Sequence, residues 1–253
     1  MHKGLCCAQL PIVLCLADQI SIHNLSVANH SIPDPDLTPF GEEQCRQLAQ
    51  SFPDHDSIDL IVCSPLRRTI YTALLGFKQD IDRCGKVIAL PEAQETANVP
   101  CDTGSDLSAL RKEMADKPVD LSLVMEGWNS KTDRWSPTAT AIEKRAREAR
   151  QWLKARPEKQ IVLVTHGGFV HFFTEDWTGY KLSMGTGWAN VEHRSYQFID
   201  DESDNASVTE TPLSKKRSRS HETPLTETEQ IKLKQSAEAS LRAGESHLVQ
   251  AKV

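Results

Sequence analysis

Short apolar runs alternate with longer amphipathic segments through the first two hundred residues. Three of the runs are continuously aliphatic and predict buried strands at Ile12–Leu16, Leu60–Cys63 and Ile161–Val164. Runs without polar alternation are typical of a sheet that is covered on both faces. Val87–Leu90 is a fourth candidate strand, and the alternating pattern from Glu192 to Ile199 predicts an edge strand.

Helices are predicted between these strands. The dipeptide Thr38-Pro39 suits a helix start, because Thr caps the first amides and Pro is tolerated at the first helical position. This helix should continue to Phe52, and three more are expected over about 65–77, over about 138–153 and directly after Gly168. The order of elements predicts an α/β fold, a three-layer sandwich with a mostly parallel central sheet and helices on both faces.

The composition changes near Asp200. No aromatic residue follows Phe198, and the rest of the chain is rich in Ser, Thr, Glu and Lys. Such a segment buries too little apolar surface to offset its ordering entropy, so 201–253 is expected to be a disordered polar tail. Thr226 and Glu229 form a capping-box pattern for one marginal helix within it. The expected domains are therefore an atypical N-terminal segment with the first strand over 1–22, a folded domain over 23–200, and the tail.

Charge narrows the classes of partner. The 253 residues carry a formal net charge of -6, which argues against a nucleic-acid partner. The longest apolar run, Leu10–Ala17, is far shorter than the roughly 20 residues that span a bilayer, so no membrane partner is expected. A basic cluster, Lys215, Lys216, Arg217 and Arg219, fits either a nuclear-import or anionic-surface signal or a solvated charge run. The solvated charge run is favoured because short basic motifs often match by chance.

The seven cysteines show neither a C-x-x-C pair nor regular spacing, so neither a zinc site nor a disulfide framework is expected. They indicate reduced thiols in a cytosolic or nuclear protein. Lys3 and the apolar residues up to Ala17 loosely resemble a secretory signal, but Gln9 and Pro11 interrupt the pattern, and a core strand is the preferred interpretation.

Polar residues follow three of the predicted strands, at the edge where ligands of parallel sheets bind. Arg68 lies at a helix start, where a guanidinium and free backbone amides suit an anion; a surface Arg is the alternative. His166 and Gly167 follow an aliphatic strand, and glycine lets the backbone come close to a ligand. Glu92 and Glu95 are candidate general acids or, equally, solvated loop residues. Together these residues suggest a phosphoryl site without metal or cofactor, since the chain has neither a Walker loop nor a carboxylate cluster for Mg²⁺.

Three ordered motifs carry a resemblance to a known family. They are Leu37-Thr38-Pro39-x-Gly41-x-x-Gln44, Ser64-Pro65-Leu66-x-Arg68-x-x-x-Thr72-Ala73 and Thr165-His166-Gly167-Gly168. From roughly His23 to Ile199 the chain resembles the histidine phosphatase superfamily, in its phosphoglycerate-mutase-like branch, with small fungal members most similar. The resemblance implies that a His after the first strand attacks phosphorus, that two Arg and a second His hold the phosphoryl oxygens, and that a carboxylic acid protonates the leaving oxygen.

Carried over by motif, Arg68 matches the second phosphate-binding Arg and His166 the second His, with Gly167 beside it. Glu92 is the first choice for the acid and Glu95 the second. Asn24 matches the phosphate-contacting Asn that follows the nucleophile by six positions. The resemblance thus implies a metal-independent phosphatase that hydrolyses a small phosphorylated metabolite, a phosphomonoester, through a phosphohistidine intermediate.

The family's first motif, Arg-His-Gly or Arg-His-Ala, is absent. Counting back from Asn24 places Ala17 and Asp18 at the Arg and His positions, and neither can replace the pair, because Ala is uncharged and a carboxylate repels phosphate. Three explanations stay open. His23 substitutes as nucleophile; the chain is an inactive pseudophosphatase that binds phospho-ligands or acts as an interaction protein; or the first twenty or so residues come from a misassigned exon. The abrupt start of the match at His23 favours the last.

Residues 92–137 are polar and irregular, and we expect them to cross one end of the sheet and shape the pocket mouth through Asp102, Asn129 and Lys131. Trp128 and Trp135 either cover a ligand or pin this loop down, and the second role is the more usual one. The sequence indicates neither the identity of the substrate nor the oligomeric state.

Overall fold

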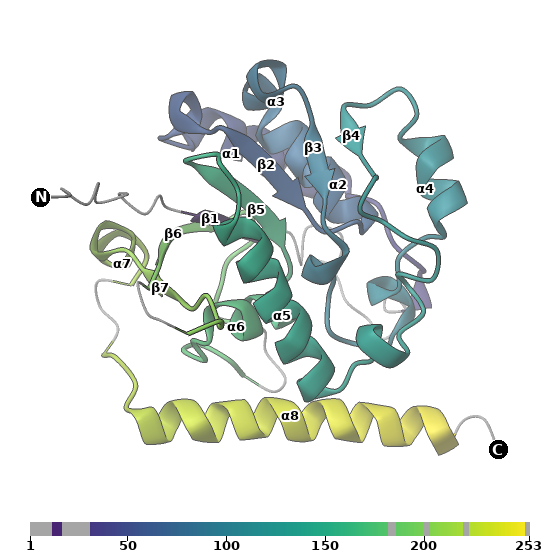
Figure 1. Ribbon diagram of the computed structural model, residues 1–253, viewed down its shortest axis with the longest axis vertical. Coiled ribbons are helices and arrows are strands. Elements are labelled where there is room, and N and C mark those ends of the chain that lie inside the picture. The colour runs from purple at the N-terminus through teal and green to yellow at the C-terminus, as the bar shows by residue number, and fades with distance from the viewer. Residues whose placement is uncertain (1–11, 17–30, 182–185, 200–202, 220–222, 251–253) are drawn as a thin grey trace, which may run out of the picture.

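The computed structural model describes residues 12–16, 31–181, 186–199, 203–219 and 223–250 (Figure 1). Several residues named in the sequence analysis lie outside the described residues: Ala17, Asp18, His23 and Asn24.

A mixed sheet forms the centre of the molecule. Within the described residues it has seven strands in the order β4-β3-β2-β5-β1-β6-β7. β1 to β5 pair in parallel, whereas β6 and β7 are antiparallel to their neighbours. The strands are β1 (Ile12–Leu16), β2 (Leu60–Cys63), β3 (Val87–Ala89), β4 (Val119–Asp120), β5 (Ile161–Thr165), β6 (His193–Phe198) and β7 (Val208–Glu210). The three aliphatic strands and the fourth candidate are confirmed.

Helices cover both faces of the sheet, which confirms the three-layer prediction. α1 (Pro39–Ser51), α2 (Arg67–Gly76), α3 (Lys78–Cys84) and α4 (Leu107–Glu113) share one core with Val13 and Cys15 of β1. α5 (Ala139–Lys154) and α6 (Gly167–Thr174) share the opposite core with Ile12 and Leu14. Because neighbouring side chains of a strand face opposite ways, a central strand between two helical layers must be apolar at every position.

Side-chain caps fix the starts of two predicted helices. Thr38 Oγ1 accepts a hydrogen bond from the amide of Gly41 at 3.1 Å, and Thr138 Oγ1 accepts one from the amide of Ala141 at 3.3 Å. All four predicted helices are present, with ends that differ by a residue or two. The unpredicted helices α3 and α4 have seven residues each, too few for a clear periodic pattern.

The segment 92–137 is pinned to the core. Its regular structure beyond α4 and β4 consists of short 3₁₀ turns at η3 (Pro91–Ala93), η4 (Pro100–Asp102) and η5 (Asp133–Trp135). Trp128, within this segment, is fully buried, and a Cβ at Gly104 would lie 2.1 Å from its indole ring. Trp128 therefore anchors the loop and does not cover a ligand.

The C-terminal region differs from the disordered tail expected over 201–253. β7 pairs with β6, so β6 is not the edge strand that its alternating pattern predicted. α7 (Pro212–Ser218) follows β7, and both Val208 and Glu210 are buried. The composition did not predict this folded region, because it is stabilised by backbone pairing and buried polar contacts and contains only a few apolar side chains.

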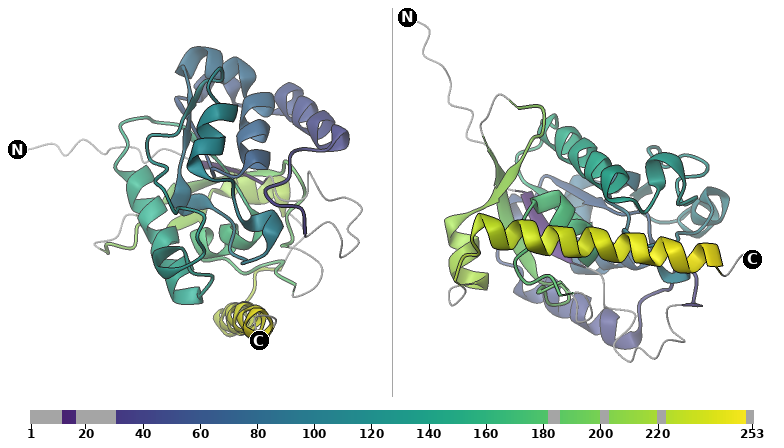
Figure 2. Two further views of the ribbon diagram at one scale, coloured as in Figure 1. Left: turned by 90° about the vertical axis from the view of Figure 1, so that its right-hand side faces the viewer. Right: turned by 90° about the horizontal axis from the view of Figure 1, so that it is seen from below.

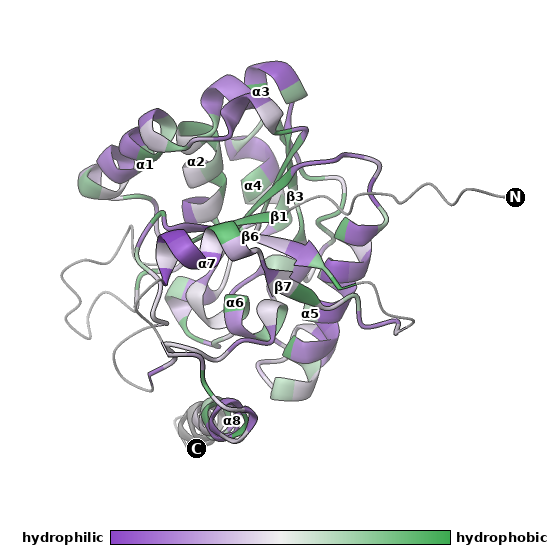
Figure 3. Ribbon diagram, turned by 90° about the vertical axis from the view of Figure 1, so that its left-hand side faces the viewer, coloured by the Kyte–Doolittle hydropathy of each residue, from purple (hydrophilic) through white to green (hydrophobic). Residues whose placement is uncertain are grey.

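α8 (Glu227–Gln250) runs along the outside of the body (Figure 2). The capping box is confirmed: the Glu229 amide donates to Thr226 Oγ1 at 3.3 Å, and the Thr226 amide donates to Glu229 Oε2 at 2.7 Å. Leu233, Ala237 and Leu241 pack on the core, while most of the helix is polar, in contrast to the apolar β1 (Figure 3). Among the described residues, the helices lack the combination of length and apolar character that crossing a membrane requires.

Candidate active site

Arg68 and His166 meet at the carboxyl ends of β2 and β5. Arg68 lies in the first turn of α2, and His166 is the N-cap residue of α6. The Nη2 of Arg68 donates to His166 Nδ1 and to Asp102 Oδ1, both at 3.0 Å, while its Nη1 donates to the carbonyl of Cys101 at 2.7 Å. Because a guanidinium has only donors, His166 Nδ1 must accept, and the ring proton therefore belongs on Nε2.

His166 is neutral in this setting. The side chain is fully buried. Burial first, and then the positive charge of Arg68, hold the pKa of His166 well below its usual value. The ring thus presents an Nε2–H donor, which suits a phosphoryl oxygen.

Glu95 lies at the N-terminus of α6. Its carboxylate accepts hydrogen bonds from the amides of Gly168 at 3.1 Å, Phe169 at 3.0 Å and Thr96 at 2.7 Å. A Cβ at Gly168 would lie 2.5 Å from Glu95 Oε1, so only glycine permits this approach. The first turn of α6, with Gly167 as its first residue, therefore holds an acidic group beside His166.

Two buried cations hold the turn that carries Glu95. Lys131 Nζ donates to the Glu95 carbonyl at 2.9 Å. Arg145 donates to the same carbonyl at 3.1 Å and to the carbonyl of Gln94 at 2.5 Å. Burial, followed by repulsion from Arg145, lowers the pKa of Lys131 to about 7. The charge of Lys131 therefore changes within the physiological pH range.

Glu92, the first choice for the acid, is not brought to this group. Its carboxylate pairs with Arg134 at 2.7 Å, and Arg134 also pairs with Glu148 of α5. Burial raises the pKa of Glu92, but its surroundings are a surface groove that includes Trp152. The structure gathers Glu95 with Arg68 and His166, together with Asp102 and Lys131 of the expected pocket loop. Asn129 instead donates to the carbonyl of Gly104 at 2.8 Å.

A sequence profile of the histidine phosphatase superfamily (branch 1) matches residues 23–210. The chain belongs to the histidine phosphatase superfamily.

Individual relatives agree with this membership. The chain is 28% identical over 212 residues to phosphoglycerate mutase-like protein 1 of Arabidopsis thaliana, covering 68% of this chain and 73% of that protein. It is 27% identical over 150 residues to a probable phosphatase of Schizosaccharomyces pombe, and the match covers 57% of this chain and 68% of that protein. The ecdysone phosphate phosphatase of Bombyx mori, solved with tungstate, shares the fold at a TM-score of 0.54 and 14% identity, covering 81% of this chain and 93% of that one.

β1 ends beside this candidate site, and the resemblance implies that the nucleophile follows the first strand. Leu16, the last residue of β1, is the register partner of Thr165, which directly precedes His166. Ala17 and Asp18 come next in the sequence, and the family profile begins only at residue 23. The part of the site described here is therefore its β2, β3 and β5 side.

Two residues of the site were not predicted from the sequence. Arg145 shares the buried face of α5 with Ile142 and Ala149, so helical spacing could have placed it inward. Asp34 fixes the start of α2 by accepting from the amides of Arg67 at 3.0 Å and Ser105 at 2.8 Å; no sequence signal marks it. Among the described residues, no group of three or more His, Cys, Asp or Glu is placed to hold a metal ion.

Proposed function

We propose that this protein binds the phosphoryl group of a small phosphomonoester, a phosphorylated metabolite, and hydrolyses it through a phosphohistidine intermediate. The observation that carries the proposal is the buried contact between Arg68 and His166, which places a guanidinium and an Nε2–H donor at one strand edge. Such preorganised donors stabilise the charge on transferring phosphoryl oxygens. The likeness to the probable phosphatase of Schizosaccharomyces pombe supports the same chemistry.

The proposed reaction has two steps. A histidine nitrogen attacks phosphorus and the bond to the leaving oxygen breaks, while the Glu95 carboxyl gives that oxygen its proton. Water then attacks the phosphohistidine, Glu95 takes a proton from the water, and inorganic phosphate leaves the free histidine. Arg68 and His166 hold the non-bridging oxygens in both steps. His23 is the candidate nucleophile in this chain.

A second candidate function is a pseudophosphatase that binds phospho-ligands or acts as an interaction protein without turning substrate over. The observation that favours it is the pair that follows β1, Ala17 and Asp18, in place of the family's Arg and His. A carboxylate there repels phosphate, so catalysis would be lost while Arg68 and His166 keep an affinity for phosphoryl groups.

Metal-free hydrolysis of p-nitrophenyl phosphate by the full chain, with acid-labile phosphohistidine as a second readout, tests the proposal. Turnover that is lost in His23→Ala and in His166→Ala supports the enzyme. Glu95→Gln should lower kcat by at least about a hundredfold, whereas Glu92→Gln, its matched control, should leave kcat unchanged. Phosphate binding without turnover supports the pseudophosphatase. Neither binding nor turnover contradicts both functions.

We also propose a cytosolic or nuclear location, without a nucleic-acid or membrane partner. Five described cysteines are free thiols, and Cys15 and Cys63 lie fully buried in the sheet. Thiol labelling of the denatured protein from a non-reducing cell extract tests the location: complete labelling supports a reducing compartment, and oxidised cysteines contradict it.

A further inference from the structure

A cavity of about 620 Å³ lies between the C-terminal region and the domain that carries the active site. Its walls come from the end of α6, from β6, from β7 and α7, and from the segment that leads into α8. A volume of this size suits a small ligand. The cavity includes Thr174, the last residue of α6, roughly 10 Å along the helix from Gly167. It is therefore separate from the Arg68–His166 site.

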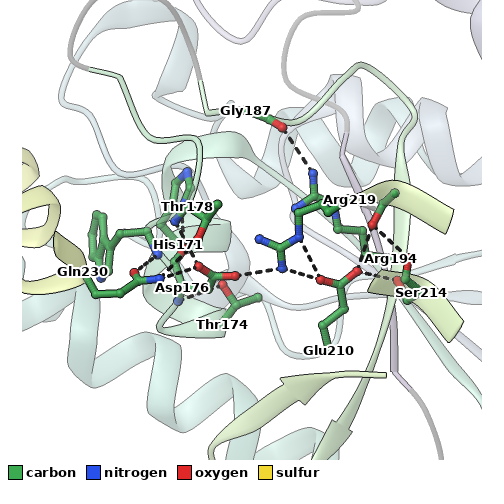
Figure 4. Close-up of polar contacts among 12 residues, drawn as sticks. His171, Thr174, Asp176, Thr178, Gly187, Arg194, Glu210, Ser214, Arg219 and Gln230 are labelled. Atoms are coloured by element: carbon green, nitrogen blue, oxygen red, sulfur yellow. Dashed lines mark hydrogen bonds and ion pairs between the residues drawn. The ribbon is translucent and has the colours of Figure 1, made fainter. Parts of the chain in front are cut away.

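Ion pairs link three charged residues of the cavity wall (Figure 4). Arg219 lies between Asp176 and Glu210 and forms ion pairs with both. Glu210 also accepts from Ser214 Oγ at 2.6 Å, and Asp176 accepts from Gln230 Nε2 at 3.0 Å. Burial alone would raise the pKa of Asp176, but the hydrogen bonds of its neighbours and Arg219 lower it. Asp176 is thus held as an anion, and both carboxylates have partners of their own within the wall.

Two ammonium groups and one hydroxyl of the wall have neither an ion-pair nor a hydrogen-bond partner of this kind among the described residues. Lys215 and Lys216 line the cavity, and neither has an acidic partner among the described residues. The Tyr196 side chain is only 2% exposed and stacks on Trp188, yet within the described chain its hydroxyl has no hydrogen-bond partner. A tyrosine hydroxyl at a cavity wall is a hydrogen-bond donor that a ligand can use.

The wall also has an apolar part, formed by Val208, Pro224 and Leu225. The cavity therefore combines two ammonium groups and a hydroxyl donor with an apolar surface. Counting Arg219, Lys215 and Lys216 against Asp176 and Glu210, the charged groups that face the cavity favour an anion.

We propose that this cavity binds an organic anion in which a phosphate or carboxylate head is joined to an apolar body. Lys215 and Lys216 hold the head, Tyr196 donates a hydrogen bond to the ligand, and the apolar wall covers the body. The basic cluster then has two roles: Arg219 builds the cavity and the two lysines bind. Arg217 faces away, where it donates to the carbonyl of His193 at 3.3 Å.

The probe is 1-naphthylphosphonate, whose carbon–phosphorus bond resists hydrolysis, titrated calorimetrically into the full chain that carries Arg68→Ala. This substitution removes the phosphoryl contact of the active site. In that background the Lys215→Ala/Lys216→Ala pair should weaken binding at least about tenfold, because two charge-assisted contacts are lost. Tyr196→Phe should weaken binding about threefold to tenfold. Naphthoate and inorganic phosphate then distinguish a carboxylate head from a phosphate head and show the contribution of the apolar body.

Control variants distinguish a loss of direct ligand contacts from a loss of folding and from a change in the net charge of α7. Arg217→Ala removes a charge from the same helix and should leave the affinity within about twofold, while Lys215→Arg/Lys216→Arg should keep most of the binding. Thermal unfolding identifies variants that fail to fold. Unchanged affinity in the double Ala variant, or the absence of probe binding in the Arg68→Ala background at millimolar concentration, would overturn the proposal. Either result leaves the proposed phosphatase function untouched.

Discussion

β1 and β5 are neighbouring parallel strands that end at the same edge of the sheet, yet they differ in chemistry. β5 leads into Thr165-His166-Gly167-Gly168 and the start of α6, where His166 contacts Arg68 and the Gly168 amide contacts Glu95. β1 is equally buried and pairs with β5 in register over all five of its residues. The residues that follow it in the sequence, Ala17 and Asp18, carry neither the positive charge nor the imidazole that the resemblance implies there.

The comparison shows that the fold and the chemistry of a strand depend on different residues. The core needs the aliphatic side chains within β1, and these are present. The resemblance assigns catalysis to the residues just beyond the strand, and in this chain these are Ala17 and Asp18. The contact between Arg68 and His166 therefore coexists with a chain that lacks the family's first motif.

The largest expected effect is on catalytic efficiency, when the residues after β1 are given the positively charged side chain and the imidazole that they lack. Ala17→Arg combined with Asp18→His should raise kcat/KM for an aryl phosphate by about a thousandfold or more, because nucleophilic residues contribute effects of this size or greater. Steady-state assays with and without His166→Ala provide the measurement. A doubly substituted chain that folds but stays at the native rate would show that more than this motif is missing.

Next in size is the effect of the β1 core on stability. Leu14→Ala should lower the free energy of unfolding by about 2 to 5 kcal/mol, since Leu14 is fully buried in the core with α5 and α6. Asp18→Asn should change it by less than about 0.5 kcal/mol if the residues beyond the strand serve chemistry alone. Urea unfolding of both variants compares the two roles directly.

The contacts at the end of β5 are tested by adding a methyl group at Gly168. Gly168→Ala should lower the free energy of unfolding by about 1 to 3 kcal/mol, because the Cβ collides with Glu95 Oε1 and Thr96 Oγ1, at 2.5 and 2.6 Å. A double-mutant cycle with Glu95→Ala is the check. In the Glu95→Ala background, Gly168→Ala should lower the free energy of unfolding by much less than it does in the native chain. If the effects of the two substitutions simply add, the contact between the new Cβ and the Glu95 carboxylate is contradicted.

The smallest effect is on pH dependence. Lys131, with a pKa of about 7, loses its positive charge as the pH rises from 6 to 8. Affinity for sulfate, whose own charge is constant over this range, should therefore fall roughly threefold to tenfold. Lys131→Arg should flatten the profile, as arginine stays protonated. A native affinity that is constant, or one that rises with pH, would show that Lys131 does not contribute to the anion site.

Sequence patterns predicted the layers of the fold because buried parallel strands are continuously aliphatic and capped helices carry local signals such as Thr38-Pro39. They predicted Arg68 because it lies at the helix start just beyond one strand, and His166 because it directly follows another. They ranked Glu92 above Glu95 because spacing does not show which carboxylate faces α6; the three amide contacts of Glu95 decide that. β7 and α7 were missed because their order depends on long-range pairing with β6 and on the partners of Glu210.

The most direct test of the central claim is calorimetric titration of inorganic phosphate into the native chain and into Arg68→Ala, with circular dichroism to confirm folding. The account predicts saturable binding to the native chain. It predicts affinity at least about tenfold weaker in the variant, because charge-assisted hydrogen bonds of the guanidinium are lost. Equal affinity in the two proteins, or no binding to either, would contradict a phosphoryl site built on Arg68 and His166.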